Sequence, residues 1–372
     1  MSARAYLDWN ATAPLRPEAR AAMIEALDVV GNPSSVHAEG RAAKAIKERA
    51  RAAILEAAGG QGYDLVFTSG ATEAAATVLR AGWRRVLASP VEHDCIAAHE
   101  GAAASWEAVP LDDEGIVHPR EVPALRPGPG TLVAVQAANS ETGITQPLFD
   151  TPAGVAGTGA VVLTDAVQHF GKLPFAAAWQ PPAIYMLSAH KIGGPKGIGA
   201  LLIPQGLDLP PLIVGGGQEM GRRAGTEDVA AMAGFAAAAT AAAHDLGTGV
   251  WDRVAELRNV LECALEDGEH PTILVGKGAP RLPNTSCVIA PGWRGETQVM
   301  RMDLAGFAVS AGSACSSGKV RTSRVLRAMG FGEAEAGCAV RVSLGPATTE
   351  DEVSRFADAW RGARDKALKR AA

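Results

Sequence analysis

The chain has 372 residues, of which 47% are hydrophobic and 20% are charged, and its formal net charge is −5. This high apolar fraction and small net charge exclude an intrinsically disordered protein. Because 35 Lys and Arg are balanced by 40 Asp and Glu, no overall basic field favours direct binding to nucleic acid. At this length a single hydrophobic core stops growing, so we expect two domains, or one large domain with an appendage.

Strand and helix patterns alternate through the first two thirds of the chain. Short buried strands are predicted at residues 63–68, 85–89, 131–136, 160–164, 183–187 and 198–203. Helices are predicted between several of them, at residues 17–30, 38–58, 73–81 and 93–104. The alternation indicates an α/β fold with a mostly parallel sheet covered on both faces, in which ligands bind beyond the carboxyl ends of the strands.

A smaller unit follows a helical pattern at residues 226–245. Its predicted helices cover residues 250–267 and 350–369, and its predicted strands cover residues 272–275, 285–289 and 339–343. The turn Gly247-Thr248-Gly249 is the expected boundary. We therefore expect a large domain at residues 13–249 and a small domain formed by residues 1–12 and 250–372.

The sequence shows no pattern that predicts a membrane protein or a disulfide-stabilised one. The N-terminal residues lack the apolar core of a signal peptide, and the apolar run from Val229 to Ala243 is shorter than the roughly 20 residues of a membrane span. We expect a cytoplasmic protein with no membrane partner. The cysteines are odd in number and form no CxxC pair, which argues against a disulfide framework or a zinc site: Cys95, Cys263, Cys287, Cys315 and Cys338.

The strongest motif is the segment Ser188-Ala189-His190-Lys191, which follows a predicted strand and precedes a glycine-rich loop. A lysine at such a buried position suits Schiff-base formation with an aldehyde cofactor, since its amine must lose its proton to react. An ordinary lysine at the end of a strand is the alternative. The glycines after Lys191 do not fit a dinucleotide-binding motif, because they precede a strand instead of a helix.

A carboxylate ends another predicted strand. Asp165 follows the strand at 160–164, and Gln168 lies three residues further on. A carboxylate aimed into the ligand crevice suits a protonated pyridine nitrogen. A helix N-cap with a loose capping box is an equally good interpretation of these two residues.

Two glycine-containing turns have the composition of anion-binding sites. Ser69-Gly70-Ala71-Thr72 leads from a strand into a helix, whose first N–H groups can bind phosphate, although an ordinary turn with a Thr cap has the same pattern. Gly215–Thr226 places Arg222 and Arg223 beside a hydroxyl at a helix start. It is interpreted as a second anion-binding element or as a loop with solvated arginines.

Cys315 lies in the segment Ser310-Ala311-Gly312-Ser313-Ala314-Cys315-Ser316-Ser317-Gly318-Lys319. A thiol surrounded by Gly, Ser and Ala is typical of an accessible loop that carries a reactive cysteine, the alternative being an inert surface thiol. The spacing of Gly312 and Gly318-Lys319 does not match a phosphate-binding P-loop.

Together, these motifs resemble the cysteine desulfurases of the NifS/IscS type, within the class V aminotransferase group of pyridoxal-phosphate (PLP) enzymes. The resemblance extends over nearly the whole chain. It rests on Ser188-Ala189-His190-Lys191, Arg223-Ala224-Gly225-Thr226 and Gly312-Ser313-Ala314-Cys315, with further matches at Tyr6–Thr12, Gly31–His37 and Val340–Gly345. Glu73-Ala74-Ala75-Ala76 and Asn139-Ser140-Glu141 depart from the family's frequent residues.

The resemblance implies the fold type I of PLP enzymes, with a mostly parallel seven-stranded sheet in a large domain and a smaller α+β domain. It also implies the site. Lys191 would hold PLP covalently and move protons at the substrate α-carbon, and His93 would stack on the ring and exchange protons. The other implied cofactor-binding residues are Ala71, Thr72, Asp165, Gln168, Ser188 and His190, with Thr226 from the second subunit of a homodimer. Asn139 and Arg341 would hold the substrate carboxylate.

The implied reaction converts L-cysteine to L-alanine and leaves the sulfur as a persulfide on Cys315. The implied partners are an iron–sulfur scaffold or another sulfur-acceptor protein. No resident metal is expected, although Cys315 could ligate an iron–sulfur cluster transiently. A selenocysteine lyase, another class V aminotransferase-like enzyme and a non-catalytic partner subunit are the alternatives.

Overall fold

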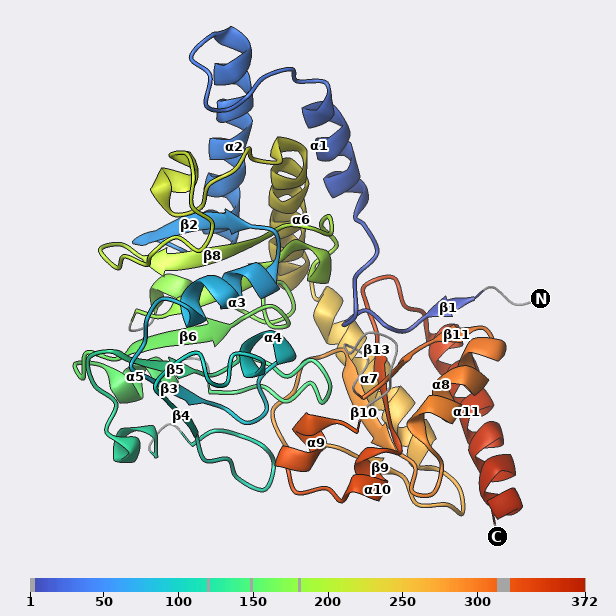
Figure 1. Ribbon diagram of the computed structural model, residues 1–372. Coiled ribbons are helices and arrows are strands. Elements are labelled where there is room, and N and C mark those ends of the chain that lie inside the picture. Colours follow the sequence, from blue (N-terminus) through green and yellow to red (C-terminus); the bar gives the residue numbers. More distant parts are fainter. Residues whose placement is uncertain (1–3, 119–120, 148–149, 180–181, 313–321, 372) are drawn as a thin grey trace.

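The computed structural model describes residues 4–118, 121–147, 150–179, 182–312 and 322–371. Figure 1 shows a large part built on one sheet and a smaller part that contains the C-terminal helix. The central sheet has seven strands in the order β2-β8-β7-β6-β5-β3-β4. Its strands are β2 (Tyr63–Thr68), β3 (Arg85–Ala88), β4 (Ser105–Ala108), β5 (Thr131–Ala134), β6 (Val161–Asp165), β7 (Ile184–Ser188) and β8 (Gly199–Pro204).

The strand directions confirm the predicted fold class. Only β8 runs against its neighbours, because it pairs antiparallel with both β2 and β7, while the remaining pairs are parallel. As a result β2, β6 and β7 all end at the same edge of the sheet. The sequence motifs that follow these three strands therefore meet there.

Side chains of the central strands alternate between the two faces of the sheet. In β7, Tyr185 and Leu187 contribute to one core, whereas Ile184 and Met186 contribute to the other. The first core is covered by α1 (Pro17–Leu27), α2 (Ala38–Ala57), α5 (Asp150–Val155) and α6 (Val229–Gly247), and the second by α3 (Ala71–Leu79) and α4 (Asp94–Ala97). Both faces are apolar and covered, so the strands read as continuous apolar runs in the sequence.

Helix α6 is the only helix in the described part of the chain that is long and apolar enough to cross a membrane, by length and composition alone. Its buried residues, including Met232, Phe235 and Ala239, pack instead in the core of the large part. A Cβ built on Gly234 would lie 2.6 Å from Cγ of Met23 in α1. The small side chains of α6 thus permit close helix packing.

The smaller part combines the C-terminal third of the chain with the N-terminus. Its four-stranded sheet has the order β12-β13-β10-β9, and β1 pairs with β11 in parallel. Ala5 and Leu7 pack in the same core as Trp251, Phe356 and Trp360. The strands are β1 (Ala5–Tyr6), β9 (Ile273–Leu274), β10 (Thr285–Ile289), β11 (Phe307–Ala308), β12 (Ser310–Ala311) and β13 (Ala339–Ser343). The domain boundaries at residues 12 and 249 stay a prediction.

The remaining helices surround the smaller sheet or form short turns. The α-helices are α7 (Val250–Glu266), α8 (Gly295–Leu304), α9 (Arg324–Ala328), α10 (Glu333–Ala336) and α11 (Glu350–Ala371). The short 3₁₀ helices are η1 (Val122–Leu125), η2 (Ala177–Trp179), η3 (Ala189–Lys191) and η4 (Gln218–Gly221).

Several elements differ from the sequence-based predictions. The helix predicted at 93–104 is one turn, α4, followed by turns that include Gly101 at φ +97°. The pattern did not indicate β4, a short strand at the sheet edge, or α8. Helix α6 begins at Val229 and not at residue 226, because the Asp228 side chain caps it by accepting a hydrogen bond from the backbone N–H of Ala231.

Candidate functional site

A cavity of about 620 Å³ lies beyond the carboxyl ends of β2, β6 and β7. The N-terminal segment at 10–12 and Arg341 of β13 complete its wall from the smaller part of the molecule. The predicted site residues that line it are Ala71, Thr72, His93, Asp165, Gln168, Ser188, His190, Lys191 and Arg341. Residues that are distant in sequence therefore meet in one cavity at the predicted edge of the sheet.

One end of the cavity has the features of an anion site. Helix α3 begins here at Ala71, and its N-cap Gly70 makes no side-chain capping bond, so its first N–H groups point toward the cavity end without a cap. His190 Nδ1 lies 3.2 Å from Thr12 Oγ1, and burial together with the nearby Lys191 lowers the pKa of His190 to about 4. His190 is therefore a neutral hydrogen-bonding group at pH 7.

Lys191 lies at the end of η3, directly after β7. Its Nζ donates hydrogen bonds to the backbone carbonyls of Asn10, at 2.7 Å, and Ala11, at 2.9 Å. Both acceptors come from the N-terminal segment, so the smaller part of the molecule fixes the direction of this amine.

Asp165 and Gln168 lie on the turn after β6. Asp165 is buried, and its Oδ1 accepts a hydrogen bond of 2.9 Å from the backbone N–H of Val167. No helix follows within the described turn at 166–172, so the helix-cap interpretation is wrong. Burial raises the pKa of Asp165, while the nearby His93 and Lys191 act in the opposite direction. A cationic group of a ligand would compensate the negative charge of this carboxylate.

His93 caps α4 and also lines the cavity. Its Nδ1 accepts a hydrogen bond of 3.1 Å from the backbone N–H of Cys95. This contact makes Nδ1 an acceptor and places the proton of the neutral ring on Nε2. Next to it, Glu92 is fully buried, and burial together with the Asp165 carboxylate raises the pKa of Glu92 to about 8.

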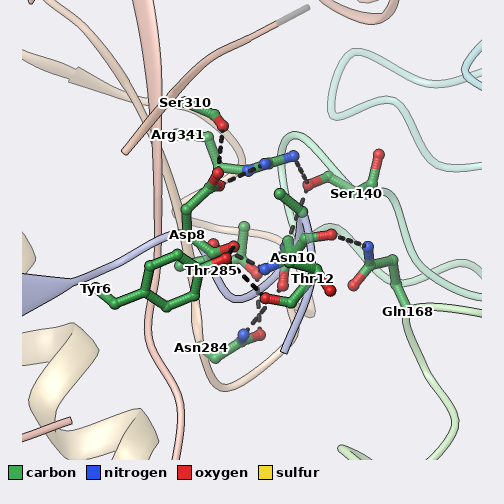
Figure 2. A network of polar contacts seen from close by, with 12 residues as sticks. Tyr6, Asp8, Asn10, Thr12, Ser140, Gln168, Asn284, Thr285, Ser310 and Arg341 are labelled. Atoms are coloured by element: carbon green, nitrogen blue, oxygen red, sulfur yellow. Dashed lines mark hydrogen bonds and ion pairs between the residues drawn. The ribbon is translucent and has the colours of Figure 1, made fainter. Parts of the chain in front are cut away.

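Figure 2 shows Arg341 held against Asp8. Arg341 Nη2 forms an ion pair of 2.7 Å with Asp8 Oδ1, and its Nη1 donates to the Ser140 carbonyl at 3.1 Å. Asp8 in turn accepts a hydrogen bond of 2.7 Å from Ser310 Oγ. A guanidinium has five N–H donors, so three remain after these contacts, including Nε–H, which is buried without a partner in the described structure.

Asn139 differs from its predicted role. Its Nδ2 donates to the Val91 carbonyl at 3.0 Å, and its Oδ1 accepts from the backbone N–H groups of Glu141 and Thr142. Among the described residues of this turn, it is Ser140 and not Asn139 that lines the cavity. Asn139 thus supports the wall without forming it.

The contacts of Arg222 and Arg223 do not support an anion-binding role for these two side chains. Arg222 pairs with Asp64 at 2.8 Å, and Arg223 pairs with Glu73 at 3.0 Å. Carboxylates neutralise both side chains, so the arginines have a structural role within this chain. Thr226 is exposed and lies outside the described lining of the cavity.

Cys315 lies outside the described residues, so its position stays a prediction. The four cysteines in the described part of the chain are all free. No group of three or more metal-ligating side chains is found among the residues that the structure describes.

Two groups of residues that organise the site could not be identified from the sequence. Asn10 and Asp8 are part of the Tyr6–Thr12 motif, but nothing in that motif indicates that Asn10 accepts from Lys191 at the edge of the large sheet or that Asp8 pairs with Arg341 of β13. Lys172 is buried behind Gln168, although a lysine at the end of a turn is ordinarily exposed. Only the mixed polar and apolar composition at 165–172 could have signalled a buried polar network.

The class-V aminotransferase family model matches residues 5–356. The chain belongs to the class-V aminotransferase family. Among its relatives, a cysteine desulfurase of Cereibacter sphaeroides is 39% identical, over 95% of this chain and 94% of that protein. The cysteine desulfurase IscS of Dictyoglomus turgidum is 34% identical, over 96% of this chain and 94% of that protein.

Solved structures agree with this family. A NifS-like protein from Rickettsia africae has a TM-score of 0.89 and 30% identity, covering 97% of this chain and 99% of that one. A structure of SspA in complex with cysteine has a TM-score of 0.77 and 26% identity, covering 93% and 100% of the two chains. The chain therefore has the type I fold of PLP enzymes, as the resemblance implied.

Class-V aminotransferases depend on PLP, and the cavity fits this cofactor. The uncapped start of α3 suits the phosphate, and the buried Asp165 suits a protonated ring nitrogen. Lys191 lines the same cavity, and two carbonyls direct its amine. The groups that would bind the phosphate, the ring nitrogen and the aldehyde carbon of PLP therefore occur in one cavity.

Proposed function

We propose that this protein is a PLP-dependent cysteine desulfurase, which converts L-cysteine to L-alanine and takes up the sulfur as a persulfide on Cys315. The observation that carries the proposal is the single cavity in which Lys191, Asp165 and Arg341 meet. The full-length similarity to cysteine desulfurases supports the choice of substrate.

Each residue of the cavity would have its own role in binding PLP or in moving a proton. Lys191 would hold PLP and move the α-proton of the substrate, while Asp165 would bind the ring nitrogen. Gln168 would donate to the phenolic oxygen, and His93 would cover the ring. Ala71, Thr72, Ser188 and His190 would bind the phosphate. When bound, PLP supplies an electron sink for the substrate α-carbon after its proton has left.

Arg341 would orient the substrate. N–H groups that Asp8 and Ser140 leave unused can bind a carboxylate, and the contacts to Asp8 and Ser140 hold the guanidinium plane still. The amino acid would then lie with its α-carbon toward Lys191, because both side chains line the same cavity.

Cys315 would attack the substrate sulfur as a thiolate. A bond forms between the two sulfur atoms while the bond between the substrate β-carbon and its sulfur breaks, and the carbon skeleton takes up protons to leave as L-alanine. Ser310 pairs in register with Arg341, and Cys315 follows it by five residues. A chain of that length spans up to about 17 Å, which lets the thiol meet a substrate bound at Arg341.

The proposal extends to a homodimer in which Thr226 reaches the phosphate site of the partner subunit. Thr226 is exposed, and so are large apolar side chains of the segment around α1, including Val30, which is 81% exposed, and Val36, which is 86% exposed. Apolar groups so exposed on a monomer favour an interface. The persulfide would then pass to a sulfur-acceptor protein, such as an iron–sulfur scaffold.

Sulfide and alanine formation test the proposal. The holoenzyme is incubated with L-cysteine and a thiol reductant, and both products are measured for wild type and for Cys315→Ala. We expect equal amounts of alanine and sulfide from wild type, and loss of both from Cys315→Ala with an unchanged cofactor spectrum. Full desulfurase activity of Cys315→Ala would contradict the persulfide step.

A further inference from the structure

Lys172 is a buried lysine that the proposed reaction does not use. It is only 2% exposed and follows Gln168 by four residues, on a turn that places both side chains on one side. Its Nζ donates to Gln168 Oε1 at 2.6 Å and to Asn10 Oδ1 at 3.1 Å. Each of these acceptors belongs to a residue that contacts the cofactor cavity.

The surroundings of Lys172 disfavour its charged form. The titratable and charged groups that interact electrostatically with Lys172 are Lys191, Arg341, His169 and His190. Within the described part of the chain, no carboxylate pairs with Lys172. Burial and the neighbouring cations therefore lower the pKa of Lys172 well below its usual value. Its amine has N–H groups for both acceptors.

The contacts around Gln168 allow its side-chain amide only one orientation. Lys172 donates to Oε1, and on the other side the Asn10 carbonyl accepts from Nε2 at 2.9 Å. Figure 2 shows the Gln168 amide directed at Asn10. One hydrogen of Nε2 is used there, so the second remains for the cavity that Gln168 lines.

We propose that Lys172 is a positioning residue that fixes the Gln168 amide so that an N–H group, and not the carbonyl oxygen, faces the phenolic oxygen of the cofactor. The role rests on the proposed function, since it concerns the same PLP site. Lys172 itself lines a second cavity of about 220 Å³ behind Lys191. It therefore acts on the cofactor through Gln168 and not by direct contact.

The visible absorption band of the holoenzyme tests this role in Lys172→Met, which keeps the aliphatic stem and removes both N–H groups. In this variant only the Asn10 carbonyl still holds the Gln168 amide, so its N–H group is less firmly directed at the phenolic oxygen. The phenolic oxygen then becomes more basic and holds the proton that it shares with the Lys191 nitrogen more tightly. We expect the pH at which the band is half lost to rise by about one unit, the size of one hydrogen bond to a charged group.

A double variant separates this role from a through-space effect of charge. Gln168→Leu should raise the same midpoint by a similar amount, and Lys172→Met in the Gln168→Leu background should add nothing further. Additive shifts would overturn the proposal, because Lys172 would then act independently of Gln168. Leu261→Ala, in the core of the smaller part, is the matched control, which should lower the melting temperature and leave the midpoint unchanged.

Other results for the Lys172 variants and for the wild-type protein also test the proposal. If Lys172→Met leaves the midpoint unchanged while it lowers the melting temperature, the lysine is merely structural and the proposal fails. If Lys172→Met does not fold, Lys172→Gln takes its place, since it retains an NH2 donor group on a shorter side chain and should give a smaller shift in the same direction. A midpoint that stays unchanged in Lys172→Gln would overturn the proposal. A wild-type protein that forms no visible band with PLP would overturn the proposed function and, with it, this role.

Discussion

Arg341 shows how one residue depends on several others. It is 2% exposed, and its only carboxylate contact within the described structure is Asp8. Asp8 is held by Ser310, so the guanidinium is preorganised before any substrate arrives. The same ion pair keeps a buried charge compensated, which makes the pair important for stability as well as for binding.

We predict that Arg341→Lys raises the KM for L-cysteine about 10-fold or more, because a lysine cannot replace a bidentate contact of roughly 1.5 kcal/mol or above. Steady-state kinetics of sulfide formation measure this change. Arg355→Lys, on the exposed side of α11, is the control and should leave KM unchanged. An unchanged KM in Arg341→Lys would argue against carboxylate binding at this residue.

The buried Glu92 leads to a prediction about how the stability of the protein depends on pH. Its pKa in the folded protein is raised to about 8 by burial and the nearby Asp165, above the value of 4.5 for a free side chain. The folded state then binds the proton more tightly than the unfolded state, so this group contributes stability at low pH that is lost as the pH rises toward 8. Glu92→Gln removes this titration.

The melting temperature of Glu92→Gln relative to wild type should therefore increase between pH 5 and 9. Other titrating groups cancel in the difference, since both proteins contain them. A difference that is constant over this range would mean that Glu92 keeps one protonation state throughout.

At the scale of elements, the phosphate turn depends on how closely β8 approaches it. Gly199 begins β8, opposite Thr68 of β2, and a Cβ built on it would lie 2.6 Å from the Leu187 carbonyl and 2.9 Å from Cα of Gly70. These contacts are with backbone atoms, which cannot move aside as a flexible side chain can. The strand therefore sets the position of the helix start that would bind the phosphate.

Gly199→Ala should destabilise the protein by about 1–3 kcal/mol and also weaken PLP binding, because the Gly70 turn must shift. Chemical unfolding and fluorescence titration of the apoprotein with PLP measure the two effects. Gly247→Ala is the matched control, since a Cβ there meets no other atom within 4 Å. Equal PLP affinity in Gly199→Ala and wild type would show that the turn does not depend on the strand.

At the scale of the whole molecule, the site is assembled from both parts of the chain. The N-terminal segment directs Lys191 and Gln168 through the Asn10 carbonyl, and β13 supplies Arg341. If Thr226 of a second subunit joins them, each site in the dimer needs two chains. This arrangement can be tested by mixing variants.

We predict that mixed dimers of Lys191→Ala and Thr226→Ala regain activity that neither variant has alone at limiting PLP. The Thr226→Ala chain then has an intact Lys191 and receives an intact Thr226 from its partner. Thr226→Ala alone should bind PLP about 10-fold more weakly, the size of one hydrogen bond to a charged group. Refolding the two variants together and assaying sulfide measures the recovery, and no recovery would argue against the shared site.

Much of the sheet and the residues after its strands could be predicted from the sequence. Six of the central strands have apolar runs bounded by turns, and Lys191, Asp165 and Thr72 follow such runs. The edge strand β4 could not be predicted, because its four residues, three half-buried and one exposed, give too short a pattern. Ion pairs such as Arg223–Glu73 could not be predicted either, since their partners are 150 residues apart.

The sequence by itself therefore determined the fold class, the family and most of the residues around the proposed cofactor site, because periodicity and local motifs are properties of neighbouring residues. Only the tertiary structure decided what holds those residues in place. Asp8, Asn10 and Lys172 organise the site through contacts that span up to 333 positions of the chain. No local pattern records such contacts, since they exist only after the two parts of the molecule have packed together.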